Sequence, residues 1–328
     1  MRHRSPGQRR CTYVVLLRRE NLSDDLTELA SYLSDLSISD FEIVTVDLSD
    51  PASMEENRRV LRWLGRYVTA RPQYLDPIRA AIDLAACDKV IVADAQVRYS
   101  DEGIDRLCTL LDLHEVVEPQ DYFDPLPWWG GIETGRKLLH RGIGPLPERR
   151  STFGFRKRAV SGLRNRDSGV GPNDSVRRLA AQGAEVFSAF DIFVRRIPTA
   201  LDKWLRDRTR DADEDLAAPA KAALFFALLP IALVLDLLGG MRLASSYLGA
   251  VAFIAIALAF RGRIGAAQFF PVRACLFAPL WLFERSLSVY WMMLRKLTGG
   301  AEERRVPMVV RPRGQGAANG NETTASTR

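Results

Sequence analysis

Hydrophobic and polar residues follow two different patterns along this chain of 328 residues. From residue 12 to about 215, short β-branched runs alternate with segments whose apolar residues recur at helical spacing, which predicts strands alternating with helices. From about residue 216 to 298, long apolar stretches dominate. This change predicts a domain boundary, with a basic tail over residues 1–11 and a disordered polar tail over residues 299–328.

The first part has the pattern of an α/β domain. The predicted strands are Tyr13–Leu17, Phe41–Val46, Val90–Ala93, Val116–Pro119 and Thr152–Arg156. The predicted helices are Leu22–Leu36, Met54–Val68, Ile78–Ala86 and Ile132–Arg141. Strands that alternate with helices indicate a Rossmann-like, mostly parallel sheet. Ligands of such sheets bind at the carboxyl ends of the strands.

Two of the predicted strands end in an aspartate at that edge. Asp47 follows the run FEIVTV, and Asp94 ends the apolar part of Lys89–Tyr99, KVIVADAQVRY. A carboxylate at this position can hold a divalent metal and, through it, a diphosphate. The alternative is that Asp94 only caps the helix that follows it.

Two further segments carry candidate chemistry. The loop Pro119–Trp129, PQDYFDPLPWW, is rich in aromatic residues and prolines, which suits either loop packing or a platform for an acceptor sugar or lipid head group. Asn173 and Asp174 open a predicted helix, where an aspartate serves as an N-terminal cap. Asp174 is also a candidate general base that deprotonates an acceptor hydroxyl.

The second part has the composition of a membrane region. Ala222–Gly239 is apolar except for Asp236, and Leu243–Phe260 carries no charge. Each is about the length of roughly 20 residues that crosses a bilayer as a helix, and the short turn between them predicts a hairpin. The alternative is a buried hairpin of a soluble protein. Phe269–Leu297 mixes charges with aromatic residues, which suits a helix lying in the membrane interface.

Composition narrows the possible functions. The net charge is +6, but no nucleic-acid-binding motif accompanies it, so we expect no nucleic-acid partner. The four cysteines form no CxxC motif and the three histidines are scattered, which predicts free thiols and argues against a zinc site or a Ser-His-Asp triad. The first residues lack the apolar core of a signal peptide. Basic residues flanking the apolar segments predict a cytoplasmic N-terminal domain.

Taken together, the segments from about residue 13 to 297 resemble a family-2 inverting glycosyltransferase of the GT-A fold. The similarity is to a bacterial, membrane-anchored subgroup with a C-terminal transmembrane hairpin. FEIVTVDLSD resembles the nucleotide-binding strand, KVIVADAQVRY the strand with the DxD motif, and PNDSVRRLAAQG the helix that begins with Glu-Asp. WLRDRTR lies where related enzymes carry an arginine motif that contacts the diphosphate.

The resemblance implies a role for each candidate residue. Asp174 would be the catalytic base. The nucleotide sugar would be bound by Asp47, Asp94, Gln96, Arg206 and Arg210, and a Mg²⁺ or Mn²⁺ ion by Asp94 and Gln96. The acceptor side would be formed by Tyr122, Trp128, Trp129 and Arg156. It also implies a nucleotide-sugar donor and a lipid-linked or glycolipid acceptor. The expected location is the cytoplasmic membrane, as a multi-pass protein of the cell envelope.

The chain departs from the family pattern at two positions. Gln96 replaces the second acid of the DxD motif, and Asn173 replaces the first acid of the Glu-Asp motif. A site with one carboxylate fewer binds a hard cation less tightly. A catalytically degenerate scaffold or nucleotide-sugar sensor is therefore the alternative function. A two-helix transport subunit is disfavoured, because the apolar segments lack the charges of a transport pathway.

Overall fold

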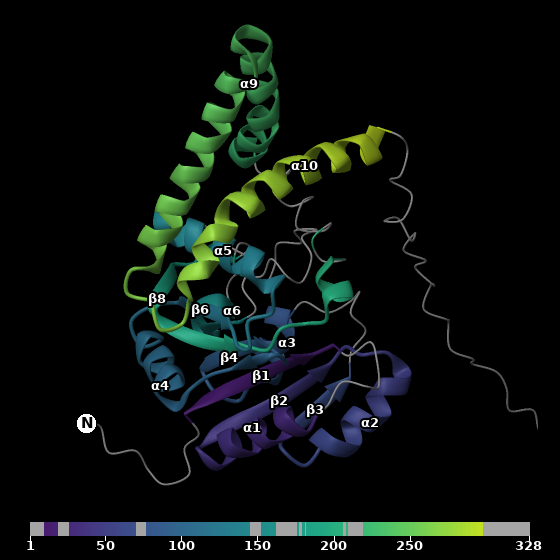
Figure 1. The fold of residues 1–328 in the computed structure, drawn as a ribbon. Coiled ribbons are helices and arrows are strands. Elements are labelled where there is room, and N and C mark those ends of the chain that lie inside the picture. The colour runs from purple at the N-terminus through teal and green to yellow at the C-terminus, as the bar shows by residue number, and fades with distance from the viewer. Residues whose placement is uncertain are drawn as a thin grey trace, which may run out of the picture.

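The computed structural model of the protein describes residues 10–18, 26–69, 77–144, 152–161, 176, 179–180, 182–205, 208 and 219–297. The strands are β1 (Cys11–Leu17), β2 (Phe41–Asp47), β3 (Arg66–Thr69), β4 (Lys89–Asp94), β5 (Val97–Arg98), β6 (Val116–Phe123), β7 (Thr152–Arg156) and β8 (Val186–Arg196). The helices are α1 (Thr27–Ile38), α2 (Pro51–Leu61), α3 (Pro77–Leu84), α4 (Asp101–Leu110), α5 (Gly130–Ile143), α6 (Lys157–Ser161), α9 (Pro219–Arg263), the 3-10 helix η3 (Val272–Phe277) and α10 (Ala278–Leu297). The predicted α/β class, followed by a helical region, is confirmed (Figure 1).

The strands form one eight-stranded sheet in the order β3-β2-β1-β4-β7-β6-β8-β5. Strands β1 to β4 pair in parallel, as the alternating pattern predicts. Beyond them the sheet is mixed, because β7 runs antiparallel between β4 and β6, and β5 runs antiparallel to β8. Strand β8 returns to the parallel direction beside β6.

Strands β3, β5 and β8 were not among the predicted strands, and β6 continues beyond the predicted end at Pro119 to Phe123. The expected helix Met54–Val68 is wrong in its second half, because α2 ends at Leu61 and β3 follows. Gly65 makes this possible: a Cβ atom there would lie 2.3 Å from the carbonyl oxygen of Ile43 on β2. Strand β8 was not predicted. Its apolar positions alternate only partly with polar ones, which obscures the strand period.

Both faces of the sheet are covered by helices. On one face, α1 and α4 contribute Leu33 and Leu107 to a core that includes Tyr13 and Ile91. On the other face, α3 contributes Ile82 to a core with Val92 and Phe155. Strand β2 is buried along its whole length. Burial on both faces explains why the strands consist of continuous β-branched runs rather than alternating ones.

Helix α9 is a hairpin of two apolar arms. Its backbone leaves the helical conformation at Gly240, where φ is 72° and ψ is −178°, and the two arms lie side by side (Figure 1). A positive φ favours glycine, so the sequence places the turn at the residue that permits it. Within Ala222–Arg263, the most apolar stretch of 18 residues has a mean hydropathy of 2.4, and 22% of it is buried. Of the described helices, this is the one long and apolar enough to cross a membrane.

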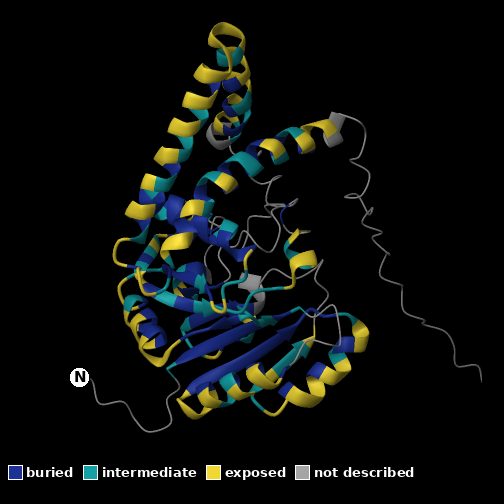
Figure 2. Ribbon diagram, in the orientation of Figure 1, coloured by how far each residue is buried: buried dark blue, intermediate teal, exposed yellow. Residues whose placement is uncertain are grey.

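Helix α10 has two different faces. Trp281, Arg285 and Val289 are buried against the rest of the protein, whereas Leu287 and Trp291 are exposed. Figure 2 shows the same alternation of buried and exposed residues along the helix. An amphipathic helix with exposed leucine and tryptophan is consistent with the prediction that this segment lies at an interface rather than across it.

Helix α5 joins the sheet to the hairpin through closely packed backbones. A Cβ atom on Gly142 would lie 1.9 Å from the carbonyl oxygen of Leu258, and one on Gly262 would lie 1.9 Å from that of Leu138. Arg141 reinforces this contact, because its Nε donates to the carbonyl oxygen of Gly262 at 2.9 Å. The apolar hairpin is therefore docked firmly on the α/β domain.

Candidate functional site

The two predicted strand-end aspartates flank the end of β1. Asp47 on β2 is in register with Leu17, and Asp94 on β4 is in register with Leu16. Because β1 lies between them, the two residues stand two strand spacings apart, roughly 9–10 Å. The register therefore places both at the carboxyl edge of the parallel strands, where α/β sheets bind ligands.

The carboxylate of Asp47 is fully buried and surrounded by neutral donors. The backbone amide of Ser49 donates to Oδ1 at 2.8 Å, and Nδ2 of Asn57 donates to Oδ2 at 2.9 Å. The Tyr67 hydroxyl also donates to Oδ2. Burial and this carboxylate raise the pKa of Tyr67 well above its usual value, so the phenol stays protonated. Asp47 thus joins β2, α2 and β3, and its role in nucleotide binding stays a prediction.

The turn after β4 holds Asp94 and Gln96 at the same edge. The backbone amide of Ala95 donates to the carbonyl oxygen of Leu16 at 3.1 Å. The backbone amide of Ile197 donates to the backbone carbonyl oxygen of Gln96 at 2.9 Å. Nη1 of the buried Arg98 donates to the carbonyl oxygen of Ala95 at 2.7 Å. Three different elements therefore fix this turn, and both side chains are half-buried.

The donor set at this turn suits a metal ion that is held mainly by its substrate. Among the described residues, no three His, Cys, Asp or Glu side chains gather where they could hold a metal ion. Asp94 contributes one carboxylate, and Gln96 an amide oxygen. A Mg²⁺ ion in phosphate-transfer sites is often bound through one or two protein carboxylates, waters and substrate phosphates. The residues therefore fit an ion shared with a diphosphate rather than a self-sufficient protein site.

A buried ionic cluster, which the sequence did not reveal, lies beside Asp94. Nζ of Lys137 on α5 lies 2.7 Å from Oδ2 of Asp121 on β6, and Nη1 of Arg196 on β8 lies 3.4 Å from the same oxygen. Burial lowers the pKa of Lys137, although the negative charges of Asp121 and Glu133 act to raise it. Burial would lower the pKa of Arg196 as well, but Asp121, Asp94 and Glu133 together raise it.

Arg196 has a donor that is left over by the hydrogen bonds of the described residues. Its Nε is buried and makes no hydrogen bond to any of the described residues. Arg196 also interacts electrostatically with Asp94, so it lies between the strand-end carboxylate and the Asp121–Lys137 pair. A buried guanidinium with a spare donor is suited to hydrogen-bond an anionic group.

The ionic cluster continues from α5 towards the helical region. Glu133 pairs with Arg136 one turn along α5 and lies 3.9 Å from Arg208. Arg208 also pairs with Glu284 on α10. Burial opposes ionisation of Glu133, but Arg136, Lys137 and Arg208 outweigh it and lower its pKa to about 2. A chain of alternating charges thus connects the sheet edge with α10.

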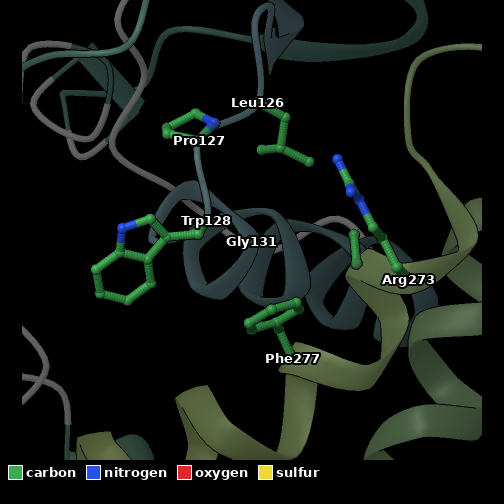
Figure 3. A pocket seen from close by; sticks show the side chains of 7 residues that line it. Leu126, Pro127, Trp128, Gly131, Arg273 and Phe277 are labelled. Atoms are coloured by element: carbon green, nitrogen blue, oxygen red, sulfur yellow. The ribbon is translucent and has the colours of Figure 1, made fainter.

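The predicted acceptor-side aromatics occupy three different environments. The ring of Tyr122 is tilted against Phe269 at 4.9 Å between centroids. Trp129 is buried and packs against Trp204 at 5.3 Å. Trp128 is 71% exposed and lines a small cavity (Figure 3). Packing explains Tyr122 and Trp129, whereas nothing among the described residues covers most of Trp128.

Arg156 lies away from the other candidate residues. In the antiparallel pair of β4 and β7 it is opposite Lys89, at the amino end of β4. It is therefore roughly 16 Å along the strand from Asp94. Nothing in the sequence shows that this strand runs antiparallel, and we leave Arg156 out of the site.

Three predicted residues cannot be placed. Asp174, Arg206 and Arg210 lie outside the described residues, although Val176 and Leu179, just after Asp174, belong to the core beneath β4. The sequence also did not reveal Asp121 or Arg196. The one available signal was the charged end of β8, where Arg195 and Arg196 follow an apolar run.

These residues define an α/β protein whose charged strand edge lies next to a long apolar helical hairpin. No family model matches the chain, and no curated protein matches it. Among solved structures, it is similar to the mannosyltransferase PcManGT from Pyrobaculum calidifontis in complex with GDP-Man and Mn²⁺, with a TM-score of 0.48 and 15% identity, over 85% of this chain and 87% of that one.

The bifunctional IspDF from Campylobacter jejuni is similar with a TM-score of 0.35 and 13% identity. That similarity covers 55% of this chain and 49% of the other, so this chain spans about half of that protein. At identities and TM-scores this low, neither similarity carries an argument about function.

Proposed function

We propose that this protein is a membrane-bound glycosyltransferase with a GT-A-like domain. It transfers a sugar from a nucleotide-sugar donor to a lipid-linked or membrane-proximal acceptor, with inversion. The observation that carries the proposal is the position of Asp94: it lies at the carboxyl edge, beside the cations of Arg196 and Lys137, on the side where α5 connects to the apolar hairpin.

The donor would lie across the ends of β2, β1 and β4. Asp47 would face the base or ribose, and Arg196 would offer its spare Nε to the diphosphate. Arg206 and Arg210 are further proposed contacts of the diphosphate. Asp94 and Gln96 would hold a Mg²⁺ or Mn²⁺ ion, which when bound would neutralise phosphate charge. The buried cations of Lys137 and Arg196 would also neutralise part of the phosphate charge without a metal, because they are already held in place.

Inversion requires a base on the face of the sugar opposite the leaving group. We assign this role to Asp174, which would accept the proton of the attacking oxygen, from a sugar hydroxyl or from the P–OH group of a lipid phosphate. As that oxygen forms its bond to the anomeric carbon, the bond to the donor breaks and the nucleoside diphosphate leaves. The neighbours of Asp174, Val176 and Leu179, are anchored in the core that includes Val92 of β4.

The acceptor is proposed to come from the membrane. The exposed surface of the hairpin includes Leu224, Leu233, Leu237 and Phe253, each more than half exposed (Figure 2). A soluble protein rarely leaves so large an apolar patch in water. We infer that both arms cross the cytoplasmic membrane and that the α/β domain stays on the cytoplasmic side, where the basic residues at the base of the hairpin favour it.

A catalytically degenerate scaffold that still binds nucleotide sugars is the second candidate. One observation favours it: among the described residues, Asp94 has only the amide of Gln96 in place of the second carboxylate. The two candidates share donor binding and differ in turnover, so binding and transfer must be measured separately.

The first test is calorimetric titration of the purified full-length protein in detergent with UDP- and GDP-linked sugars, with and without Mn²⁺. We expect one donor to bind, D94N to weaken that binding by about tenfold or more, and the exposed-surface variant D191N to bind like wild type. Mn²⁺ dependence would support a shared metal, and metal-independent binding would support the arginines. Absence of binding by every donor would refute both candidates.

The second test is transfer of labelled sugar to a polyprenyl phosphate. D174N is expected to lose about 10²–10⁴-fold in kcat while it still binds the donor, which is the usual contribution of a general base. Donor binding by wild type without transfer to lipid phosphates or glycolipids would favour the scaffold over the enzyme.

A further inference from the structure

A small cavity lies between the loop after β6, the start of α5 and the 3-10 helix η3. Its volume is about 200 Å³, and its lining consists of Leu126, Pro127, Trp128, Gly131, Arg273, Ala274 and Phe277 (Figure 3). This is smaller than the roughly 300–1,000 Å³ of pockets that enclose a drug-sized ligand. A nucleotide sugar therefore does not fit, whereas a head group with the first carbons of one chain does.

The lining is apolar except for one cation. Rings of Trp128 and Phe277 and the side chain of Leu126 form the walls, and Arg273 extends along the opening towards Leu126 (Figure 3). Among the described residues, the guanidinium of Arg273 has no hydrogen bond and no acidic partner. The mechanism proposed above does not use it. An apolar pocket with a single guanidinium at its rim is complementary to an amphiphile with an anionic head.

The cavity opens next to surfaces that we assign to the membrane interface. Val272 and Leu276 of η3 are 50% and 60% exposed, and Leu280 at the start of α10 is 49% exposed. Arg273 lies among these residues, so its long side chain can keep its charge at the head-group level while its stem covers apolar surface. A lipid can therefore reach the cavity from the membrane without passing through water.

The cavity is also close to the charged edge. Gly131 lines the cavity, and Glu133 and Lys137 of the ionic cluster lie on the same helix, within about two turns of it. At Gly131 a Cβ atom would lie 3.0 Å from the ring of Phe277, so glycine keeps this part of the lining open. The cavity is thus suited to present a bound head group towards the site that holds the donor.

We propose that this cavity binds the phosphate and first carbons of a single-chain lipid phosphate, which is the acceptor of the proposed transferase. Arg273 binds the phosphate, and Trp128, Leu126 and Phe277 contact the chain. This inference rests on the proposed function for the role of the lipid as acceptor. The narrow volume favours one chain over the two chains of a phospholipid.

The experiment measures binding of farnesyl phosphate to the full-length protein in phosphatidylcholine nanodiscs. We expect R273A to weaken binding by about tenfold or more, R273K to recover most of the affinity, and W128A to weaken it by a smaller factor. R261A is the matched control, because Arg261 is an exposed arginine at the base of the hairpin outside the cavity. Its affinity should equal that of wild type.

Comparison ligands separate the possible sources of the phosphate. Farnesol is expected to bind weakly, because it lacks the anion, and inorganic phosphate is expected to bind weakly, because it lacks the chain. If inorganic phosphate binds as tightly as farnesyl phosphate, the lipid assignment is overturned. Equal competition by dioleoyl phosphatidic acid would overturn the single-chain assignment, and equal affinities of R273A and R261A would overturn the site itself.

Donor titrations on the same samples distinguish this proposal from the proposed function. R273A should bind the nucleotide sugar like wild type and raise the KM for the lipid acceptor more than it lowers kcat. If wild type binds farnesyl phosphate through Arg273 but binds no donor, the lipid site stands and the transferase fails. If transfer proceeds with an unchanged KM in R273A, the transferase stands and the lipid site fails.

Discussion

Two buried aspartates near the carboxyl edge of the sheet have opposite surroundings. Asp47 accepts hydrogen bonds from three neutral residues that are near in sequence: Ser49 in the loop after β2, Asn57 on α2 and Tyr67 on β3. Asp121 instead faces Lys137 on α5 and Arg196 on β8, two cations from elements far apart in sequence. An aspartate side chain is thus surrounded by neutral groups in the first region and is part of a charged network in the second.

The comparison separates a carboxylate that is satisfied by neighbouring neutral groups from one that belongs to a charged network. Neutral donors satisfy Asp47 locally, so it stabilises its own β-α-β unit. The cluster around Asp121 keeps an excess of cationic donors, including the unpartnered Nε of Arg196. Burying charged groups costs several kcal/mol per ion, and a ligand that completes the pairing recovers part of this cost. We therefore expect the largest effects of substitution in the Asp121 region.

The largest effect is expected for D121N. Removing this charge leaves Lys137 and Arg196 buried beside an amide, and breaking a buried pair costs about 3–5 kcal/mol. Urea unfolding followed by circular dichroism in detergent measures the loss. The double variant D121N/K137M should recover part of it, because it removes one of the uncompensated cations. A double variant whose loss equals or exceeds the sum of the two single losses would argue against a coupled pair.

Acid pH is expected to weaken the same cluster. The pKa of Glu133 is about 2 in the folded protein and about 4.5 ordinarily, so its ionised form stabilises the fold above pH 4.5. This contribution, about 3 kcal/mol, should be lost as the pH falls from 4.5 towards 2. Unfolding free energies measured across that range test it. E133Q should lack this part of the pH dependence, and an unchanged slope in E133Q would contradict the assignment.

A smaller effect is expected for D47N. The amide side chain keeps one acceptor oxygen but cannot satisfy all three donors, which costs about 1–3 kcal/mol. The unfolding free energy should fall by this amount with no new dependence on salt, because the lost partners are neutral. If D47N lowers the free energy of unfolding as much as D121N does, the charges around Asp121 do not make its region more sensitive to substitution.

The smallest effect is expected for D191N, which breaks the exposed pair of Arg106 and Asp191. Each of these side chains is about half exposed. Exposed ion pairs contribute about 0–1 kcal/mol because water and salt screen them. The unfolding free energy should stay within this range of wild type, and a larger loss would show that exposure is a poor guide to the contribution of charges in this protein.

Much of the fold was predictable from the chain itself. Of the four strands of the parallel half, β1, β2 and β4 are short β-branched runs, and each of these three was located to within two residues at either end. The apolar hairpin was also predictable, because its length and the glycines at its turn can be recognised without tertiary contacts. The error at β3 arose because Tyr67 and Val68 continue the helical spacing of α2, and only pairing with β2 makes that segment a strand.

The candidate site was predictable only in part. Asp47 and Asp94 could be found because strand ends are marked in the sequence by an acid after an apolar run. Asp121, Lys137 and Arg196 could not, since each is an ordinary charged residue within its own segment. Their significance comes from a distance of 2.7 Å between Lys137 and Asp121, which only the packing of α5 on β6 creates.

The amino-acid sequence by itself determined the α/β pattern, the two strand-end carboxylates and the apolar hairpin. These depend on local periodicity and on the hydropathy of continuous segments. The tertiary structure decided that β7 reverses and carries Arg156 away from Asp94, that α5 joins sheet and hairpin, and that Arg273 meets Trp128 at a cavity. Such contacts join residues far apart in the chain, and the free energy that selects them comes from burial and charge pairing across elements.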